Sequence, residues 1–336
     1  MILVTGSTGL VGSHLLYKLA TNGEKVRAIY RNERKLANIK NVFACYTDNY
    51  ESIFKSIEWF KADILDIPSL SDAFKDIDYV YHCAAFVSFE PNKYHLLRKT
   101  NIEGTANVVN LCLSNNIKKL CHVSSIATLG NPHNANEITE DSEWNPEANN
   151  TIYGITKYGA EIEVWRSSQE GLDIVMVNPG VILGAGIWRY GSGSLFKKAY
   201  QGLKYYTSGS IGLVDVEDVV NIMIALTKSN ITNERFILVA ENWSYKTFLQ
   251  AMAKAVNAKI PEKLASMKLL QIGWRLDWVN HKLFGKRRQL TKHLVSSLNT
   301  QKTYSNTKIK TQLQYDFKPV SESIIEIGSL YLKQVQ

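Results

Sequence analysis

The first twelve residues constrain the fold of this chain more than any other stretch. Residues 2–4 form a short apolar run with β-branched members, which is typical of a buried parallel strand. Gly6, Gly9 and Gly12 follow at intervals of three, and an apolar helical pattern begins at Leu10. Such glycines permit a tight turn, a close approach of the backbone to a dinucleotide's pyrophosphate, and close packing of the helix. The N–H groups that begin the helix then face the anion. The stretch therefore predicts a strand, a phosphate-binding turn and a helix.

Strand and helix patterns alternate from there to about residue 180. Apolar runs predict strands at 25–30, 57–62, 79–85, 119–123 and 173–177, with helices between them that include 91–115 and 153–169. This alternation predicts an α/β fold with a doubly wound parallel Rossmann sheet. We expect a final strand, at 236–239, to return to that sheet.

Beyond Gly180 the alternation becomes irregular. The glycine-rich stretch 184–193 is expected to form a mobile loop over the site, and the chain has a helical pattern from about Tyr245 onward. We therefore expect a Rossmann domain made of residues 1–180 and about 212–242. Residues of about 181–211 and 243–336 would form a smaller, mostly helical, C-terminal substrate lobe.

The end of the second predicted strand bears on the choice of cofactor. In a dinucleotide-binding fold this position meets the adenosine ribose, and an acidic residue there accepts hydrogen bonds from a free 2′-hydroxyl. This chain instead has Arg31, with Arg34 and Lys35 close behind. A guanidinium group complements a 2′-phosphate. The sequence thus predicts a preference for NADP(H), with NAD(H) as the alternative; three exposed basic residues without a ligand are the competing explanation.

A second group of residues predicts the chemistry. Tyr153 and Lys157 lie four positions apart at the start of a predicted helix, so they share one face. An ammonium group near a phenol stabilises the phenolate, so we expect Lys157 to lower the pKa of Tyr153 and to bind the nicotinamide ribose as well. Ser125, at a strand end, would hydrogen-bond the substrate oxygen while Tyr153 transfers its proton as a hydride moves. The alternative is a surface Tyr and Lys on an amphipathic helix.

These patterns together resemble the extended, or atypical, short-chain dehydrogenase/reductases. The resemblance is carried by residues 5–12, 82–85, 123–130, 153–157 and 178–181 and is greatest to dihydroflavonol-4-reductase-like and NAD-dependent epimerase/dehydratase proteins. It implies that Ser125, Tyr153 and Lys157 are catalytic, with Asn101 in a proton relay. The spacing to Gly130 favours Ser125 over its neighbour Ser124. The resemblance also implies a homodimer formed through the helices at 91–115 and 153–169.

Further residues are expected to bind the cofactor. Asp63 would reach the adenine amino group, and the small side chains of Ala84 and Ala85 would let the cofactor pass closely. The full predicted set is Thr5, Gly6, Thr8, Gly9, Leu10, Val11, Gly12, Arg31, Arg34, Lys35, Asp63, Ile64, Ala84, Ala85, Ser124, Tyr153, Lys157, Pro179, Gly180 and Val181. No metal site is expected, because the cysteines form no CxxC pair and the histidines no HExxH or HxxxH pair.

Two differences from the sequence patterns of related dehydratases and epimerases indicate which reaction this chain catalyses. Sugar-nucleotide 4,6-dehydratases of similar fold have Asp-Glu after the catalytic Ser or Thr, whereas Ile126 and Ala127 follow Ser125 here. Epimerases of the family carry an acid where this chain has Arg31. We therefore expect an NADP(H)-dependent oxidoreductase that reduces a ketone or aldehyde, or oxidises the alcohol. The alternatives are a sugar-nucleotide epimerase, a 3β-hydroxysteroid-dehydrogenase-like enzyme and a non-catalytic dinucleotide-binding sensor.

The formal net charge of +8 is unevenly distributed. Residues 278–315 contain no Asp or Glu but eight basic residues, Lys282, Lys286, Arg287, Arg288, Lys292, Lys302, Lys308 and Lys310. Such a run is typical of a solvated face, with contact to anionic lipid or a phosphorylated ligand as the alternative. Nucleic-acid binding is not expected, because no known motif accompanies the charge. With no stretch of ~18 apolar residues and no basic segment before the first apolar run, we expect a cytoplasmic protein.

A Trp-rich segment at 264–284 precedes this basic run. Its apolar residues are too many for one helix stripe. We therefore expect part of this surface to pack on the Rossmann core and part to line a substrate cleft that admits an apolar, ring-bearing molecule. Peripheral membrane docking of the same residues is the less favoured alternative.

Overall fold

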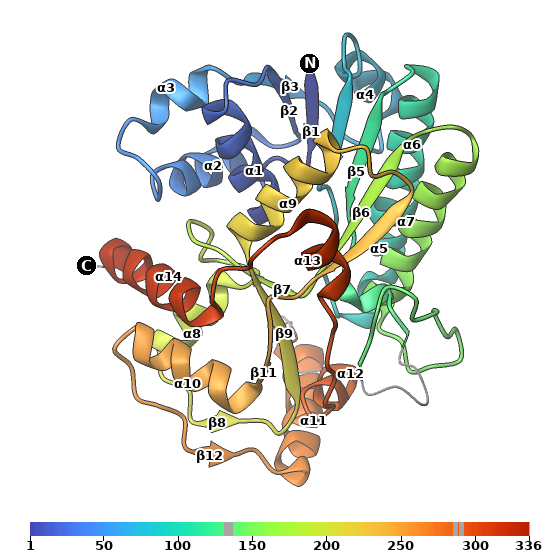
Figure 1. The fold of residues 1–336 in the computed structure, drawn as a ribbon. Coiled ribbons are helices and arrows are strands. Elements are labelled where there is room, and N and C mark those ends of the chain that lie inside the picture. The colour runs from blue at the N-terminus through green and yellow to red at the C-terminus, as the bar shows by residue number, and fades with distance from the viewer. Residues whose placement is uncertain (131–136, 285–287, 289–291, 336) are drawn as a thin grey trace.

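Seven parallel strands form the central sheet of the computed structural model, which describes residues 1–130, 137–284, 288 and 292–335 (Figure 1). The strand order is β10-β6-β5-β4-β1-β2-β3. The strands are β1 (Ile2–Thr5), β2 (Val26–Tyr30), β3 (Glu58–Lys61), β4 (Tyr79–His82), β5 (Lys119–Val123), β6 (Ile174–Pro179) and β10 (Glu234–Leu238). The first six strands have the order of a dinucleotide-binding sheet. The predicted doubly wound α/β fold is confirmed.

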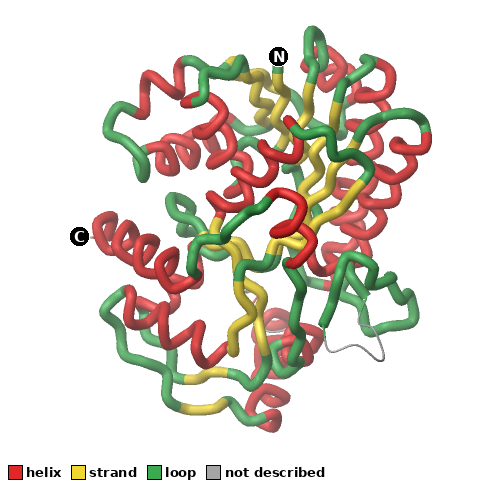
Figure 2. Tube along the Cα trace, in the orientation of Figure 1, coloured by secondary structure: helices red, strands yellow, loops and turns green. Residues whose placement is uncertain are grey.

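Helices cover both faces of this sheet, as Figure 2 shows. The helices of this part are α1 (Leu10–Thr21), α2 (Leu36–Phe43), α3 (Tyr50–Lys55), α4 (Ile67–Ala73), α5 (Tyr94–Arg98), α6 (Gly104–Ser114), α7 (Ile152–Gln169) and α9 (Val216–Lys228). Buried residues of α1, α2 and α9 pack with one face of the strands, and those of α4, α6 and α7 pack with the other. The strands are apolar on both faces because both faces are covered.

The predicted long helix at 91–115 is interrupted. A 3₁₀ turn (Pro91–Lys93) and α5 lead into a π-helical turn, Lys99–Glu103, which continues as α6. A Cβ at Gly104, the first residue of α6, would lie 2.5 Å from the Ile64 side chain. The helix axis therefore passes very close to the loop after β3, and the wide turn occurs at this approach.

The beginning of the predicted mobile loop at 184–193 is packed rather than free. Ala185 and Ile187 are buried. The backbone oxygen of Ala185 is 3.1 Å from Nε2 of His14 on α1. Gly186 has a φ of +87° and lies against Val42 of α2, where a Cβ would be 2.7 Å from backbone. Residues 184–187 are thus packed against α1 and α2, whereas Gly191 has open space around it, and the mobility of the loop stays a prediction.

The rest of the chain forms a smaller lobe below the sheet in Figure 1. It has a three-stranded sheet of order β11-β9-β7 and a two-stranded sheet, β12-β8. Its strands are β7 (Val181–Leu183), β8 (Tyr205–Tyr206), β9 (Ser210–Asp215), β11 (Glu241–Ser244) and β12 (Lys263–Leu264). Its helices are α8 (Gly193–Tyr200), α10 (Tyr245–Ala255), α11 (Met267–Phe284), α12 (Lys292–Ser297) and α14 (Val320–Val335). Helix α13 (Thr307–Leu313) returns to the large sheet, where its Ile309 is buried in the core beside β10. The predicted domain boundary near residue 212 falls within β9, and the division itself stays a prediction.

Most of the Trp-rich segment forms α11, and this helix is packed differently from our expectation. None of its residues is buried, and none belongs to the hydrophobic clusters of the described residues. The prediction that part of it packs on the Rossmann core is therefore wrong, because its aliphatic residues point outward. Lys286 and Arg287 of the basic run lie outside the described residues. Among the residues that the structure describes, no helix is long and apolar enough to span a membrane.

Candidate functional site

The turn after β1 has the geometry of a phosphate cradle. Gly6 has a φ of +67°, and a Cβ on it would lie 2.5 Å from the backbone nitrogen of Ala84. A Cβ on Gly12 would lie 2.3 Å from the backbone oxygen of Gly6. Side chains are therefore excluded where the turn folds back on the helix and on the loop after β4.

The beginning of α1 fits the pyrophosphate of a dinucleotide. Gly9 is the N-cap residue and has no side chain to bond the first N–H groups of the helix, whose first turn contains no acidic residue. Thr8, Leu10 and Val11 stay partly exposed beside it. Open N–H groups and a positive helix end are what a bound anion requires.

Thr5 joins β1 to β4 beneath this turn. Its Oγ1 lies 2.7 Å from Nδ1 of His82 and accepts a hydrogen bond of 3.2 Å from the backbone nitrogen of Ala84. Nε2 of His82 lies 2.9 Å from Oγ1 of Thr105 on α6. The predicted residues Thr5 and Ala84 thus meet Gly6 at the ends of β1 and β4, and Ala85 follows exposed.

The predicted adenosine residues also come together. A guanidinium nitrogen of Arg31 lies 3.6 Å from a carboxylate oxygen of Asp63. Arg34 and Lys35 are exposed on a 3₁₀ turn just beyond, while Ile64 is buried. A 2′-phosphate on this side would therefore meet three cations, one of which already has an acidic partner.

The two predicted catalytic hydroxyl groups meet where β5 ends and α7 begins. Thr151 caps α7 by accepting a hydrogen bond from the Gly154 nitrogen. A Cβ on Gly154 would lie 2.8 Å from the backbone oxygen of Ala127, so this helix start packs tightly on the turn that follows Ser125. The Ser125 hydroxyl lies close enough to Tyr153 to lower the pKa of its phenol, and its Oγ accepts a 3.2 Å hydrogen bond from the Ala127 nitrogen.

The expected lowering of the Tyr153 pKa is not observed. Burial of the phenol raises the pKa of Tyr153 to about 12, and the nearby Ser125 hydroxyl offsets only part of that rise. The Lys157 ammonium group is directed elsewhere: its Nζ donates a 2.8 Å hydrogen bond to the backbone oxygen of Val123. Removal of the phenolate from water therefore dominates the pKa of Tyr153.

Lys157 is fully buried, with 1% of its surface exposed. Its Nζ lies 3.4 Å from Nε2 of His122, whose ring stacks on that of His82 at 5.2 Å between centroids. Burial lowers the pKa of Lys157 to about 8, although the negative charge of Glu161 raises it. Burial also lowers the pKa of His82, to about 3, and that of His122. Lys157 therefore lies beside two neutral imidazoles.

Asn101, the predicted relay residue, lies in the π-helical turn and its side chain is fully engaged. Its Oδ1 accepts a 2.7 Å hydrogen bond from the Phe86 nitrogen, and its Nδ2 donates to the Phe86 oxygen at 3.0 Å and to Oγ1 of Thr156 at 3.1 Å. These bonds fasten the loop after β4 to α7. They give Asn101 a structural use, and the relay role stays a prediction.

Glu161 is a site residue that the sequence analysis missed. This carboxylate, one turn after Lys157, is 1% exposed. Its Oε1 accepts hydrogen bonds from the Ser124 hydroxyl, from Thr128 Oγ1 at 2.7 Å and from Asn178 Nδ2 at 2.7 Å. The signal was present: Tyr153, Lys157 and Glu161 are spaced by four, so all three share the face of α7 that packs on the sheet.

This network holds the turn that carries Ser125. Asn178 Nδ2 also donates to the backbone oxygen of Ser125 at 3.1 Å, and Thr128 Oγ1 lies 2.8 Å from the same oxygen, so its single proton is shared between this oxygen and Glu161. The Ser124 side chain, predicted to bind cofactor, is instead buried and directed at Glu161. The arrangement favours Ser125 as the serine that presents its hydroxyl to a substrate.

The last predicted cofactor residues lie at the end of β6. Pro179 ends the strand, and the Gly180 nitrogen donates a 3.0 Å hydrogen bond to the Leu238 oxygen of β10. A Cβ on Gly180 would lie 2.5 Å from the Gly212 oxygen of β9. Val181, partly exposed, begins β7 directly afterwards.

An aromatic side chain that the sequence analysis did not single out borders Tyr153. The Phe89 ring meets the Tyr153 ring edge-on, with 5.6 Å between centroids, and Phe89 is 45% exposed. Val87 is also exposed on the same loop. The surroundings of the candidate proton donor are therefore apolar.

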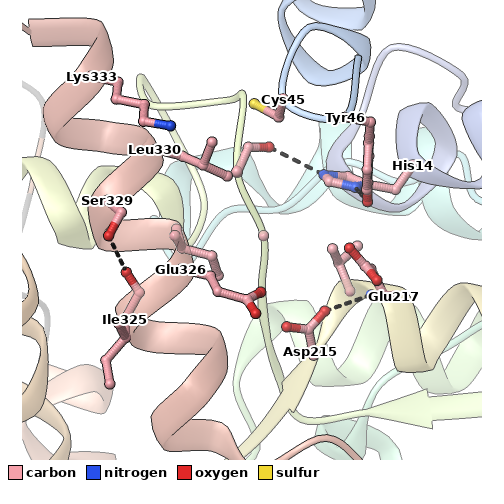
Figure 3. A pocket seen from close by; sticks show the side chains of 14 residues that line it. His14, Cys45, Tyr46, Asp215, Glu217, Ile325, Glu326, Ser329, Leu330 and Lys333 are labelled. Carbon is pink, nitrogen blue, oxygen red and sulfur yellow. Dashed lines mark hydrogen bonds between the residues drawn. The ribbon is translucent and has the colours of Figure 1, made fainter.

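A cavity of about 370 Å³ lies elsewhere, between α1, the start of α9 and α14 (Figure 3). His14, Asp215, Glu217, Glu326 and Lys333 are among the residues that line it. None of the predicted catalytic or cofactor residues does so. This cavity is therefore separate from the candidate site.

Comparison with known proteins agrees with this geometry. The model of the NAD dependent epimerase/dehydratase family matches residues 2–238. Sterol demethylase protein B of Methylococcus capsulatus is 26% identical over 317 residues, which cover 93% of this chain and 92% of that protein. Anthocyanidin reductase of Arabidopsis thaliana is 26% identical over 315 residues, which cover 82% of this chain and 89% of that protein.

A solved structure extends the likeness over the whole fold. UDP-glucose 4-epimerase of Thermotoga maritima superposes with a TM-score of 0.77 at 19% identity, covering 100% of this chain and 99% of that one. At this identity the match shows a common fold. The smaller lobe is thus part of the shared architecture.

Proposed function

This chain belongs to the NAD dependent epimerase/dehydratase family, and we propose that it is an NADPH-dependent reductase of an apolar, ring-bearing ketone or aldehyde. It is an NAD(P)-dependent enzyme of the extended short-chain dehydrogenase/reductase type. The observation that carries the proposal is the contact between the Ser125 and Tyr153 side chains at the end of β5, with the buried Lys157 one helical turn further along α7.

The residues present fit a dinucleotide. The turn at Gly6 and the open start of α1 would hold the pyrophosphate, and Lys157 the nicotinamide ribose. When bound, the cofactor supplies the hydride, or accepts it in the reverse direction. Ser125 would donate a hydrogen bond to the carbonyl oxygen, and Tyr153 would donate its proton to that oxygen as it gains negative charge. A phenol whose pKa is raised holds its proton at neutral pH, as a proton donor must.

The preference for NADPH rests on the end of β2. Arg31 stands where a 2′-hydroxyl would need an acceptor, and Arg34 and Lys35 add positive charge nearby. Asp63 lies close to Arg31, so a phosphate would compete with this carboxylate for the guanidinium group. The doubly charged phosphate and two further cations favour the phosphate in that competition.

The substrate class rests on the surroundings of Tyr153 and on the names of relatives. Phe89 presents apolar surface beside Tyr153, and Val87, two residues earlier on the same loop, is exposed. Two relatives are named for sterol demethylation and for anthocyanidin reduction, and sterols and anthocyanidins are both polycyclic. Ile126 and Ala127, after Ser125, provide no acid or base of the kind a dehydratase uses.

A kinetic comparison tests the proposal. The enzyme should reduce polycyclic ketones with NADPH and should not convert UDP-sugars. Tyr153→Phe should lower kcat about a hundredfold or more and keep NADPH affinity, since only proton transfer is lost. Tyr158→Phe on the same helix, whose ring stacks on Trp144, is the matched control and should keep normal turnover. Near-normal turnover of Tyr153→Phe would refute the assignment, and epimerisation of a UDP-sugar without net reduction would favour the epimerase alternative.

The proposal includes a homodimer formed through residues 91–115, which contain α5 and α6, and through α7, and it includes a cytoplasmic location. Ile155 and Ile162 lie seven residues apart on α7, so they share one face, and both are exposed. An aliphatic face on an exposed helix is suited to pairing with a second copy. Analytical ultracentrifugation would show a dimer, and an Ile162→Asp variant should sediment as a monomer.

A further inference from the structure

Helix α11 turns an aliphatic stripe toward solvent. Five residues at spacings of three and four make up the stripe: Leu269, Ile272, Leu276, Val279 and Leu283. Their exposed fractions run from 40% for Val279 to 68% for Leu283. The spacing places all five on one face of the helix. Leu270, Trp274 and His281, on the opposite face, are the partly buried ones. The helix thus contacts the rest of the protein through the face that contains these three residues, and it exposes the aliphatic stripe together with Trp278 and Phe284.

One edge of this stripe is basic. Lys268, Arg275 and Lys282 recur every seven residues, so they form a row beside the stripe, and all three are exposed. The acidic residue of the helix, Asp277, lies off the stripe and pairs with Arg288 at 3.5 Å. Trp278 is 45% exposed, with the Lys282 ammonium group 5.3 Å from its ring centroid. An aliphatic stripe, a basic edge and an exposed Trp are typical features of an amphipathic helix that lies in a membrane interface.

We propose that α11 docks this enzyme on the surface of an anionic membrane, with the aliphatic stripe among the acyl chains and the basic edge on lipid phosphates. The stripe extends from Leu269 to Leu283, which are 14 residue steps or about 21 Å apart at 1.5 Å per residue, and this is longer than one small substrate covers. A second copy paired antiparallel about a two-fold axis would bring the two basic edges together, and like charges repel. The sequence from Trp278 to Tyr315 contains no Asp or Glu, so no acidic residue follows α11 closely along the chain. This inference is independent of the proposed reaction.

Vesicle co-sedimentation of the full-length protein tests the proposal. The protein should sediment with vesicles of equal parts phosphatidylcholine and phosphatidylglycerol, but not with vesicles of phosphatidylcholine alone. Added salt should weaken binding, because it screens the basic edge. Arg275→Gln with Lys282→Gln should weaken binding about 25-fold, at about fivefold for each positive charge lost. Leu276→Asp with Leu283→Asp should weaken it at least ~100-fold, since two leucines no longer enter the apolar layer.

A matched double variant separates this surface from exposed apolar residues in general. Ile67→Asp with Ile325→Asp replaces two residues that are 56% and 60% exposed on α4 and α14, and it should bind the anionic vesicles like the unchanged protein. Circular dichroism and NADPH binding establish that all variants are folded. The absence of binding to anionic vesicles would overturn the proposal. So would an oligomer that Leu276→Asp with Leu283→Asp breaks apart, because a second copy would then cover the stripe.

Discussion

Replacing Glu161 by alanine should lower the stability of the enzyme and change the pH dependence of its turnover. The carboxylate accepts three hydrogen bonds through one oxygen, and its other oxygen lies 3.5 Å from a guanidinium nitrogen of Arg235. Hydrogen bonds to a charged group contribute roughly 1.5–3 kcal/mol each. The full sum is not lost, because Asn178 keeps its bond to the Ser125 oxygen and the Thr128 hydroxyl proton can turn wholly to that oxygen. The Ser124 hydroxyl and Arg235 lose a buried partner, and breaking a buried ion pair costs about 3–5 kcal/mol.

We therefore expect Glu161→Ala to lower the free energy of unfolding by about 3 kcal/mol and Tm by roughly 5 °C or more. Urea denaturation and calorimetry measure these quantities. Glu163→Ala, two residues further along α7, is the control: its partly exposed carboxylate pairs with Arg166, and such a pair contributes about 0–1 kcal/mol. Equal losses for the two variants would show that the buried network contributes nothing beyond an ordinary surface pair.

The same variant should change the pH dependence of turnover. Glu161 raises the pKa of Lys157 against the lowering effect of burial. Without this charge the pKa of Lys157 falls below about 8, so the ammonium group is lost at lower pH and the alkaline limb of kcat moves to lower pH. A purely structural effect would lower turnover equally at all pH values. An alkaline limb that stays in place would refute the electrostatic part of the reasoning.

Two further predictions concern single charges. Arg31→Ala should weaken NADPH binding about tenfold or more and leave NADH binding nearly unchanged; calorimetric titration that finds equal losses for both cofactors would exclude a phosphate contact. Lys157→Met should slow turnover and also change how stability depends on pH. Burial lowers the pKa of Lys157 in the folded state to about 8 from its ordinary 10.5. The unfolded chain therefore holds more protons between these values, and stability rises with pH across that window by about 3 kcal/mol. Urea midpoints at its two ends should show this rise in the unchanged protein and its loss in Lys157→Met; the same rise in both would contradict the assignment.

The sequence predicted the parts of the fold that depend on local pattern. Apolar runs and glycine spacing sufficed for β1, α1 and the doubly wound parallel sheet, and Gly6 and Gly12 stand where a Cβ would clash with nearby backbone. The contact of Ser125 with Tyr153 was also predictable, since the carboxyl ends of parallel strands meet at one edge of the sheet.

Features set by contacts distant in sequence could not be predicted in this way. The partners of Glu161 lie on three different elements, and Arg235 is 74 residues away. The pKa of Tyr153 depends on burial, which the spacing to Lys157 does not report. The glycines at 184–193 suggested mobility, but Gly186 serves a close contact with Val42. Apolar content in α11 suggested a core helix, and only the structure tells which face points outward.

The junction at Gly180 has a mechanical consequence. Strand β6 of the large sheet is followed by β7 of the small sheet, with only Gly180 between them. The Gly180 nitrogen is hydrogen-bonded to the Leu238 oxygen of β10. Gly180 and Gly212 stand so close that neither has room for a side chain. A displacement of the small sheet is therefore expected to move the large sheet with it. We therefore expect no hinge motion between the two lobes at this junction. Selection among substrates would then depend on side chains and peripheral helices.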